Sequence, residues 1–191
     1  MRATTKLALV LAAACAGCGG AAAPAATTPP AGTAPPAAPS ITRRAAPPPE
    51  RWCLHLADDG AGGMVTLVMN HGYADFAGKR DYPWLVQVHV EIVDRNPEGL
   101  PTAAEADVLN ALEERLTPAF LAGADLHYVG RATMPGFRDL LYYAADGPQA
   151  DAVLKEQAAL RQARAFEYTV AEDPTWSHVA PVLAEPGDCA D

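Results

Sequence analysis

Short runs of alternating apolar and polar residues predict β-strands through the C-terminal three quarters of the chain. The clearest run is 84–93, in which every second residue is apolar: Trp84, Val86, Val88, Val90 and Ile92. Because alternate side chains of a strand share one face, the opposite face carries Gln87, His89 and Glu91. Weaker alternation over 52–56 and 64–69, around a glycine-rich turn, predicts a hairpin at the start of the folded region.

A second hairpin is predicted over residues 127–143. Two runs rich in Tyr, Val, Thr and Leu flank Pro135-Gly136, and these two residues suit the corners of a tight turn. On regular strands, His127, Arg131 and Thr133 would line one face of this hairpin. A hairpin alone is not stable in water, so we expect other elements to cover it.

Two stretches have the periodicity of amphipathic helices. Thr102 and Glu105 form a capping box, in which the hydroxyl and the carboxylate each accept a backbone N–H. The following helix has an apolar stripe and an outward polar face: Val108, Leu109, Leu112 and Leu116 against Asp107, Asn110, Glu113 and Glu114. Pro118 is predicted to end or kink this helix. Asp146 opens the second helix, whose inner face contains Ala150, Val153, Leu154 and Ala158.

The last predicted strand covers 166–170 and leads into a short helical turn. Asp173 caps this turn, Pro174 takes its first position, and Trp176 is expected to fill the core beside the sheet. The element order is therefore β-β-β-α-β-β-α-β. Strands in hairpins with two interrupting helices predict an α+β fold, one largely antiparallel sheet with two helices packed on one face.

The first 49 residues predict export and a tether. A basic start and an apolar run over 7–14, too short to span a bilayer, predict a signal peptide over 1–18. This segment resembles a bacterial lipoprotein signal, which implies lipidation of Cys18 or Cys15. An ordinary signal peptide with incidental cysteines is the alternative. Residues 19–49 are rich in Ala, Pro and Thr, which predicts a disordered tether, and 50–191 are expected to form a single domain.

The charge distribution changes the choice of partners. All 23 acidic residues lie at Glu50 or later, and the formal net charge of the whole chain is −9. Loss of Arg2 and Lys6 with the signal peptide would bring the net charge to −11. Nucleic acids need clustered positive charge, so this balance argues against a DNA or RNA partner, and acidity itself promotes solubility.

Export also changes the expectation for the remaining cysteines. Cys53 and Cys189 lie at the two ends of the predicted domain. Outside the cytoplasm two such thiols usually pair, so we predict a disulfide that joins the first strand to the C-terminal tail. Two unrelated free thiols are the alternative. The spacing suits neither a zinc knuckle nor a redox Cys-x-x-Cys motif.

Three separated stretches carry a family resemblance. They are Gly99-Leu-Pro-Thr-(x)₂-Glu105, Tyr128-Val-Gly-Arg-Ala-Thr with Gly136, Arg138 and Tyr142-Tyr143, and Glu172-Asp-Pro-Thr-Trp176. Over about residues 51–183 they resemble the bacterial domain-of-unknown-function family 695, which implies an α+β domain without a settled activity. The Asp-Pro-x-Trp ending is similar to that of cytoplasmic inhibitors of ribonuclease E. That similarity implies protein binding, although export would separate this domain from that enzyme.

Two groups of residues are candidates for chemistry. His89, Glu91 and His127 could bind a metal or act as acid and base if their strands were neighbours, and a solvated sheet face is the alternative. Arg131 and Arg138 could hold a carboxylate or an acidic peptide, or could pair within the fold with Asp139, Glu105 or Glu91. Tyr142 and Tyr143 point to opposite faces, and we assign Tyr142 to the binding site as a partly exposed contact.

These observations favour a lipid-anchored domain of the cell envelope that binds a protein or peptide without catalysis. No cofactor or metal is expected, because the chain lacks Cys-rich, His-x-x-x-His and Gly-x-Ser-x-Gly patterns. The alternative is a metal-assisted or acid–base envelope enzyme that uses His89, Glu91 and His127. A structural spacer without a ligand is a third possibility.

Overall fold

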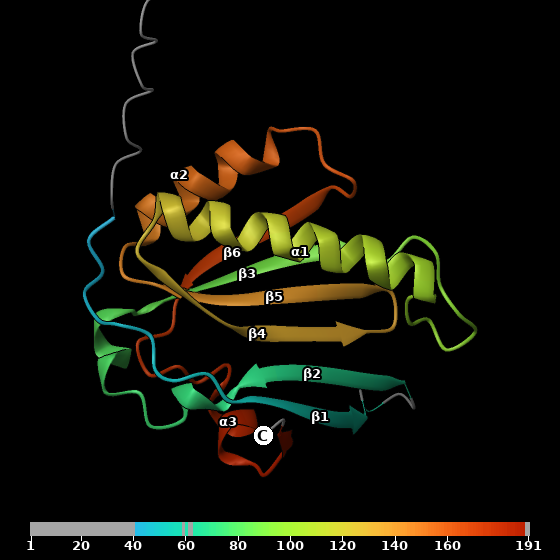
Figure 1. Ribbon diagram of the computed structural model, residues 1–191, viewed down its shortest axis with the longest axis horizontal. Coiled ribbons are helices and arrows are strands. Elements are labelled where there is room, and N and C mark those ends of the chain that lie inside the picture. Colours follow the sequence, from blue (N-terminus) through green and yellow to red (C-terminus); the bar gives the residue numbers. More distant parts are fainter. Residues whose placement is uncertain (1–40, 59, 61–62, 190–191) are drawn as a thin grey trace, which may run out of the picture. The chain divides into compact units, whose positions relative to one another are not determined.

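An antiparallel seven-stranded sheet forms the centre of the computed structural model, which describes residues 41–58, 60 and 63–189. Its strand order is β6-β3-β5-β4-β2-β1-β7 (Figure 1). The strands are β1 Trp52–Asp58, β2 Met64–Asn70, β3 Trp84–Glu91, β4 Leu126–Met134, β5 Phe137–Ala144, β6 Phe166–Glu172 and β7 Asp188–Cys189. The predicted signal peptide and both candidate lipidation sites, Cys15 and Cys18, lie outside the described residues.

Helices complete the α+β fold that the sequence predicts. They are α1 Ala103–Gly123, α2 Gly147–Ala158 and α3 Ala180–Ala184, with two 3₁₀ turns, η1 His71–Tyr73 and η2 Ala77–Asp81. The predicted order is confirmed, and β7 and α3 are added at its end. Within the described part of the chain, no helix is long and apolar enough to cross a membrane.

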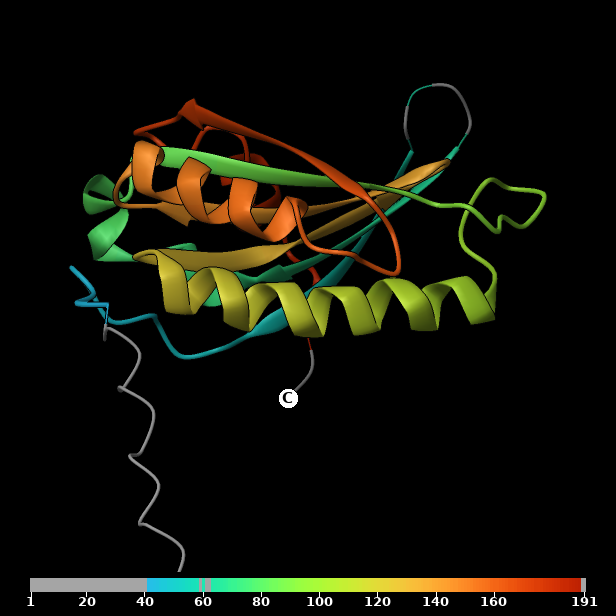
Figure 2. The same cartoon turned by 90° about the horizontal axis from the view of Figure 1, so that it is seen from above.

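The two long helices lie together on one face of the sheet (Figure 2). Leu109, Leu112, Leu116 and Phe120 of α1 pack on alternate residues of β3 and β5, and Ala150 and Leu154 of α2 join the same core. This core covers β6, β3, β5 and β4. The helix-side face of β1 and β2 stays open, and Leu54 and Leu56 there are 41% and 67% exposed.

A second core covers the opposite face. Trp176 is fully buried and stacks on Tyr143 with ring centroids 3.9 Å apart, which confirms its predicted role in the core. Tyr73, Tyr82 and Leu183 close the same layer. Because both faces of β5 are covered, Tyr142 and Tyr143 are both buried, and the prediction that one of them is partly exposed is wrong.

Pro118 does not end α1, so the first of the two predicted outcomes, an end or a kink at this proline, is wrong. The helix continues for five further residues to Gly123, and Phe120 in this last stretch is fully buried. Proline removes one backbone N–H from a helix at a cost of about 3 kcal/mol. Burial of a Phe side chain contributes a similar amount, so packing on the sheet keeps the last turns helical.

A β-bulge between Tyr128 and Gly130 changes the facing of β4. The extra residue puts His127 in the second core, while Arg131 and Thr133 point to the helix side. The prediction that His127 shares a face with Arg131 and Thr133 is therefore wrong. Glycine is needed at the bulge because an added Cβ at Gly130 would lie 2.4 Å from the main-chain oxygen of Val68.

Cys53 and Cys189 form a disulfide between β1 and β7, as the sequence predicts. The two cysteines are 136 residues apart in the chain, so the bond joins the ends of the folded region. A strand as short as β7 cannot hold its place by two paired residues alone, and the disulfide fixes it against β1.

The folded part begins before Glu50, the predicted start of the domain. Residues 43–50, which we call the N-terminal strap, lie against the domain. The Arg43 guanidinium donates to the main-chain oxygen of Leu126 at 2.7 Å, and the Arg44 N–H donates to the Asp125 carboxylate at 2.8 Å. A cation beside the last turn of α1 is also favoured by the helix dipole. The end of the predicted tether is thus part of the fold.

Candidate binding site

A pocket of about 250 Å³ opens where the helix layer stops short of β2. Its floor is the helix-side face of β2, β4 and β5, and its rim is the loop that leads into α1. The pocket is lined by Thr66, Val68, Asn96, Leu100, Pro101, Arg131, Thr133 and Arg138. Both arginines that the sequence assigns to binding are therefore brought together in one pocket.

One carboxylate serves both arginines. Arg131 Nη1 lies 2.9 Å from Glu113 Oε2, and Arg138 Nη1 lies 3.9 Å from the same oxygen. The other oxygen of Glu113 accepts the Tyr128 hydroxyl at 2.7 Å. The closer contacts of Arg138 are to neutral groups, the Thr133 hydroxyl and the Asn110 amide oxygen. Two guanidinium groups thus face one carboxylate, which leaves a formal surplus of one positive charge.

This surplus is largely screened from water. The side chains of Arg138 and Glu113 are 6% and 13% exposed, and Arg131 is 28% exposed toward the pocket mouth. Burial, and then repulsion from Arg131, lower the pKa of Arg138, although an arginine stays protonated at physiological pH. A buried cation without its own counter-ion is costly, so an incoming anion gains more here than at an exposed surface.

The internal partners of the arginines differ from those predicted. Glu105 pairs with Arg164, and Asp139 accepts from Gln87 and lies 2.8 Å from His89 Nδ1. The helical periodicity predicts Glu113 on the outward polar face of α1. That placement is wrong because Glu113 lies at the edge of the buried stripe, where its long side chain reaches the sheet.

Tyr142 does not belong to this pocket. It is fully buried in the helix-side core, and its hydroxyl lies 2.8 Å from the Thr117 hydroxyl. The prediction that Tyr142 is a partly exposed contact is wrong, because Phe120 of α1 packs edge-on against its ring and Thr117 of α1 reaches its hydroxyl.

The alternative catalytic set, His89, Glu91 and His127, is not assembled. β5 separates β3 from β4, and His89 lies opposite Asp139 while His127 lies opposite Tyr143, four residues along the same strand. Glu91 is exposed and pairs with Arg95. Among the described residues, no group of three or more His, Cys, Asp or Glu side chains is placed to hold a metal ion.

Two features were not predicted from the sequence: the role of Glu113 as the shared partner of the two arginines, and the docking of the N-terminal strap on the domain. Glu113 follows the buried Leu109 by four residues and precedes the buried Leu116 by three, which is a signal of an edge position on a helix. Arg43 and Arg44 are the only charged residues in an otherwise uncharged stretch, and this was the available signal for docking.

Comparison with known proteins supplies the family. Neither the curated proteins nor the solved structures that were compared with this chain gave a match. The model of a family described as "Family of unknown function (DUF695)" matches residues 62–180. That range is more than half of the chain and runs from just before β2 through the arginine pocket and past the Asp-Pro-Thr-Trp turn. The chain belongs to this family of unknown function, DUF695.

Proposed function

We propose that this protein is exported and lipid-anchored, and that its domain binds a carboxylate-bearing segment of an envelope protein or peptide. The observation that carries the proposal is the surplus guanidinium charge of Arg131 and Arg138 in a pocket of an otherwise acidic protein. A carboxylate would restore charge balance and could accept two parallel N–H bonds from one guanidinium.

The rest of the pocket suits a peptide. Asn96, Thr66 and Thr133 offer polar groups, and Val68, Leu100 and Pro101 offer apolar surface for a neighbouring side chain. Arg131 lies at the mouth and meets the ligand first, while Arg138 lies deeper and is oriented by Thr133 and Asn110. A fixed guanidinium loses less conformational entropy when it binds a carboxylate.

Export rests on the leader sequence and is supported by the disulfide. Disulfides persist in oxidising compartments outside the cytoplasm and are rare within it. The Cys53–Cys189 bond is therefore the bond expected of an exported domain.

Binding is tested with a glutamate-rich hexapeptide and its glutamine counterpart, titrated against the purified full chain at low salt. We expect the glutamate peptide alone to bind. Arg131→Gln should weaken its binding about tenfold, the effect of one lost charge-assisted hydrogen bond. Arg115→Gln is the matched control, because Arg115 is exposed on α1 and the change in net charge is the same. If the two substitutions weakened binding equally, only the net charge of the protein would matter, and the pocket would be excluded as the peptide-binding site.

The anchor is tested separately by labelling cells with radioactive palmitate. We expect label on the wild-type protein and on only one of the Cys15→Ser and Cys18→Ser variants. An unlabelled protein in the soluble cytosolic fraction would refute export and anchoring without affecting the peptide result.

A further inference from the structure

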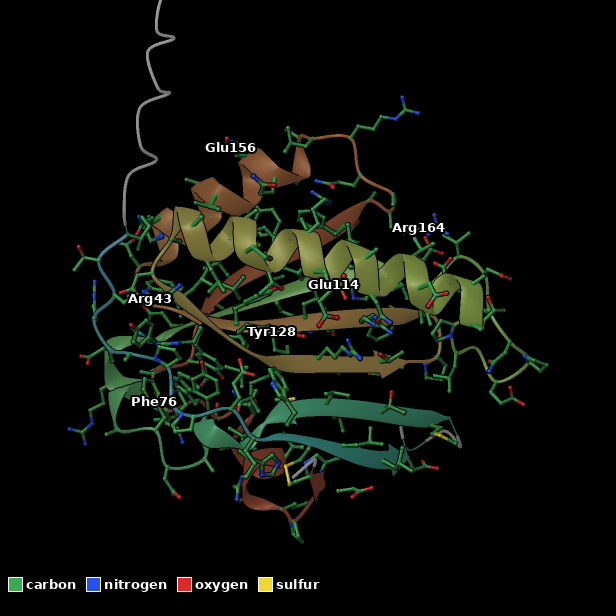
Figure 3. All side chains as sticks on the ribbon, in the orientation of Figure 1. Arg43, Phe76, Glu114, Tyr128, Glu156 and Arg164 are labelled. Atoms are coloured by element: carbon green, nitrogen blue, oxygen red, sulfur yellow. A yellow bond between two sulfur atoms is a disulfide. The ribbon has the colours of Figure 1, made fainter. Side chains whose placement is uncertain are left out.

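An exposed apolar surface lies beside the arginine pocket, on the helix-side face of β1 and β2. The exposed fractions there are 41% for Leu54, 67% for Leu56 and 49% for Met64, and we call these three residues the β1–β2 face. In the view of Figure 3, α1 and α2 lie in the upper part of the molecule and β1 and β2 in the lower part, with Tyr128 of β4 between them. Exposed apolar side chains that lie together on a surface mark an interaction site.

The strand register makes the β1–β2 face continuous with the arginine pocket. Leu54 lies opposite Val68 on β2, and Val68 lies opposite Arg131 on β4. In the next row Leu56 lies opposite Thr66, and both Thr66 and Val68 also line the pocket. Neighbouring strands are about 4.8 Å apart, so a ligand that packs on the face also reaches Arg131.

The open area has the dimensions of one helix. The two strands β1 and β2 give a width of about 10 Å, which is also the diameter of an α-helix. The length of β1, 7 residues, corresponds to about 20 Å, which a helix of about 13 residues would match. An added helix would lie beside α1 and extend the layer of helices over β2 and β1.

An added strand fits this surface less well than a helix does. β7 already pairs with Cys53 and Leu54 at the outer edge of β1 and is held there by the disulfide, so only residues 55–58 could pair with a new strand. Such a strand would also leave Leu54 and Leu56 uncovered, because their side chains project from the face of the sheet. A second copy of the chain that used the same face would bring a second arginine pocket, also with surplus positive charge, to the interface.

We propose that the ligand of the arginine pocket is an amphipathic α-helix of an envelope protein. Its apolar stripe packs on the β1–β2 face, and an acidic residue at the edge of that stripe pairs with Arg131. Arg131 is 28% exposed and shares Glu113 with Arg138, so it can accept a second carboxylate. This inference rests on the proposed function, to which it adds the secondary structure of the ligand and its apolar half.

Three synthetic peptides of about 15 residues test this proposal. In the striped peptide, leucines at alternating spacings of three and four residues form one apolar stripe, with glutamates along one edge of it. The scattered peptide has the same composition, with its leucines spread around the helix, and the glutamine peptide is the striped peptide with each glutamate replaced. Each is titrated against the purified full chain by fluorescence anisotropy. We expect the striped peptide to bind about tenfold more tightly than either control and to gain helical circular dichroism on binding.

Substitutions locate the binding surface. Leu56→Thr should weaken binding of the striped peptide about fivefold, because a largely exposed leucine would become buried in the complex. Leu160→Thr is the matched control and should have no effect, because Leu160 is 51% exposed but lies between α2 and β6, near the opposite edge of the sheet. Both side chains are exposed in the free protein, so both variants are expected to fold. Arg131→Gln should reduce the difference in affinity between the striped and the glutamine peptide.

The outcomes separate this inference from the proposed function. If the glutamate-rich hexapeptide binds but the striped and scattered peptides bind equally, the helical ligand is excluded and the arginine pocket stands. If neither the hexapeptide nor the striped peptide binds, both proposals fail. Two results would assign the β1–β2 face to another occupant and overturn the inference: binding to phosphatidylglycerol vesicles that Leu56→Thr abolishes, or a dimer in sedimentation that Leu56→Thr dissociates.

Discussion

Asp173→Asn should destabilise the protein in a way that depends on pH. Asp173 is 8% exposed and accepts four hydrogen bonds. Their donors are the Tyr143 hydroxyl, the Ser177 N–H and hydroxyl, and the His178 N–H. Burial alone would raise its pKa, but these hydrogen bonds lower it from 3.8 to about 2. Asparagine has nearly the same shape but carries no charge for these donors to stabilise.

The size of the effect follows from the pKa. A shift of about 1.8 units corresponds to about 2.5 kcal/mol, because each unit contributes about 1.4 kcal/mol. The pKa is lower in the folded state, so this stabilisation is complete above the unfolded pKa and is lost as the pH falls toward 2. The difference between wild type and variant should therefore be about 2.5 kcal/mol at pH 7 and pH 5, and about half that at pH 3.

Urea unfolding, followed by tryptophan fluorescence with the disulfide intact, measures this difference. Asp107→Asn is the control, because Asp107 is exposed on α1 and should change stability by less than about 0.5 kcal/mol at each pH. If Asp173→Asn cost the same at pH 7 and pH 3, ionised Asp173 would not be the species that the turn stabilises.

Three further predictions concern stability. Reduction of the Cys53–Cys189 disulfide should lower the free energy of unfolding by about 5 kcal/mol on a chain-entropy estimate, and thermal unfolding with and without dithiothreitol checks this. Gly130→Ala should lower the free energy of unfolding by about 2 kcal/mol or more, because the added methyl group clashes with β2. This decrease should be larger than that in Gly60→Ala, where the added methyl group meets no atom within 4 Å. Between pH 7 and pH 4 the free energy of unfolding of the wild type should fall by about 3 kcal/mol more than that of His127→Phe. The reason is that His127 protonates near pH 6.5 in the unfolded state, whereas burial lowers its pKa to about 4 in the folded state. Equal decreases in urea titrations of the two proteins would contradict a neutral, buried His127 ring.

Local patterns predicted most of the fold. The alternation over 84–93 correctly grouped Val86, Val88 and Val90 on one face of the strand, because period-two alternation is a property of the strand itself, and this face is buried in the helix-side core. Only one of the two hydrogen bonds predicted for the capping box is present. The Thr102 hydroxyl accepts the Glu105 N–H, but the Glu105 carboxylate bonds to Arg164 and to the Val93 N–H. The Thr102 N–H donates to Asp94. A distant arginine competed with the local motif, and local sequence does not show such a competitor.

The candidate site was predicted only in part, for a related reason. Arg131 and Arg138 lie close together because they belong to the two strands of one hairpin, and this hairpin can be predicted from the local sequence. Their shared partner Glu113 depends on how α1 lies across the sheet, which no short-range pattern specifies. The separation of His89 from His127 depends on strand order, and the facing of His127 depends on a one-residue bulge. The glycine within that strand, Gly130, was the one local signal of a bulge.

The bond between Cys53 and Cys189 makes the chain between them a covalently closed ring. The ring contains β2 to β6 and all three helices, and with them both arginines of the candidate pocket. Tension applied to the N-terminal segment enters this ring at a single point. If a bound partner pulls at the pocket, the load divides between two covalent routes, one through β1 and one through β7. The site is thereby protected from the end-to-end extension that would unravel an open chain.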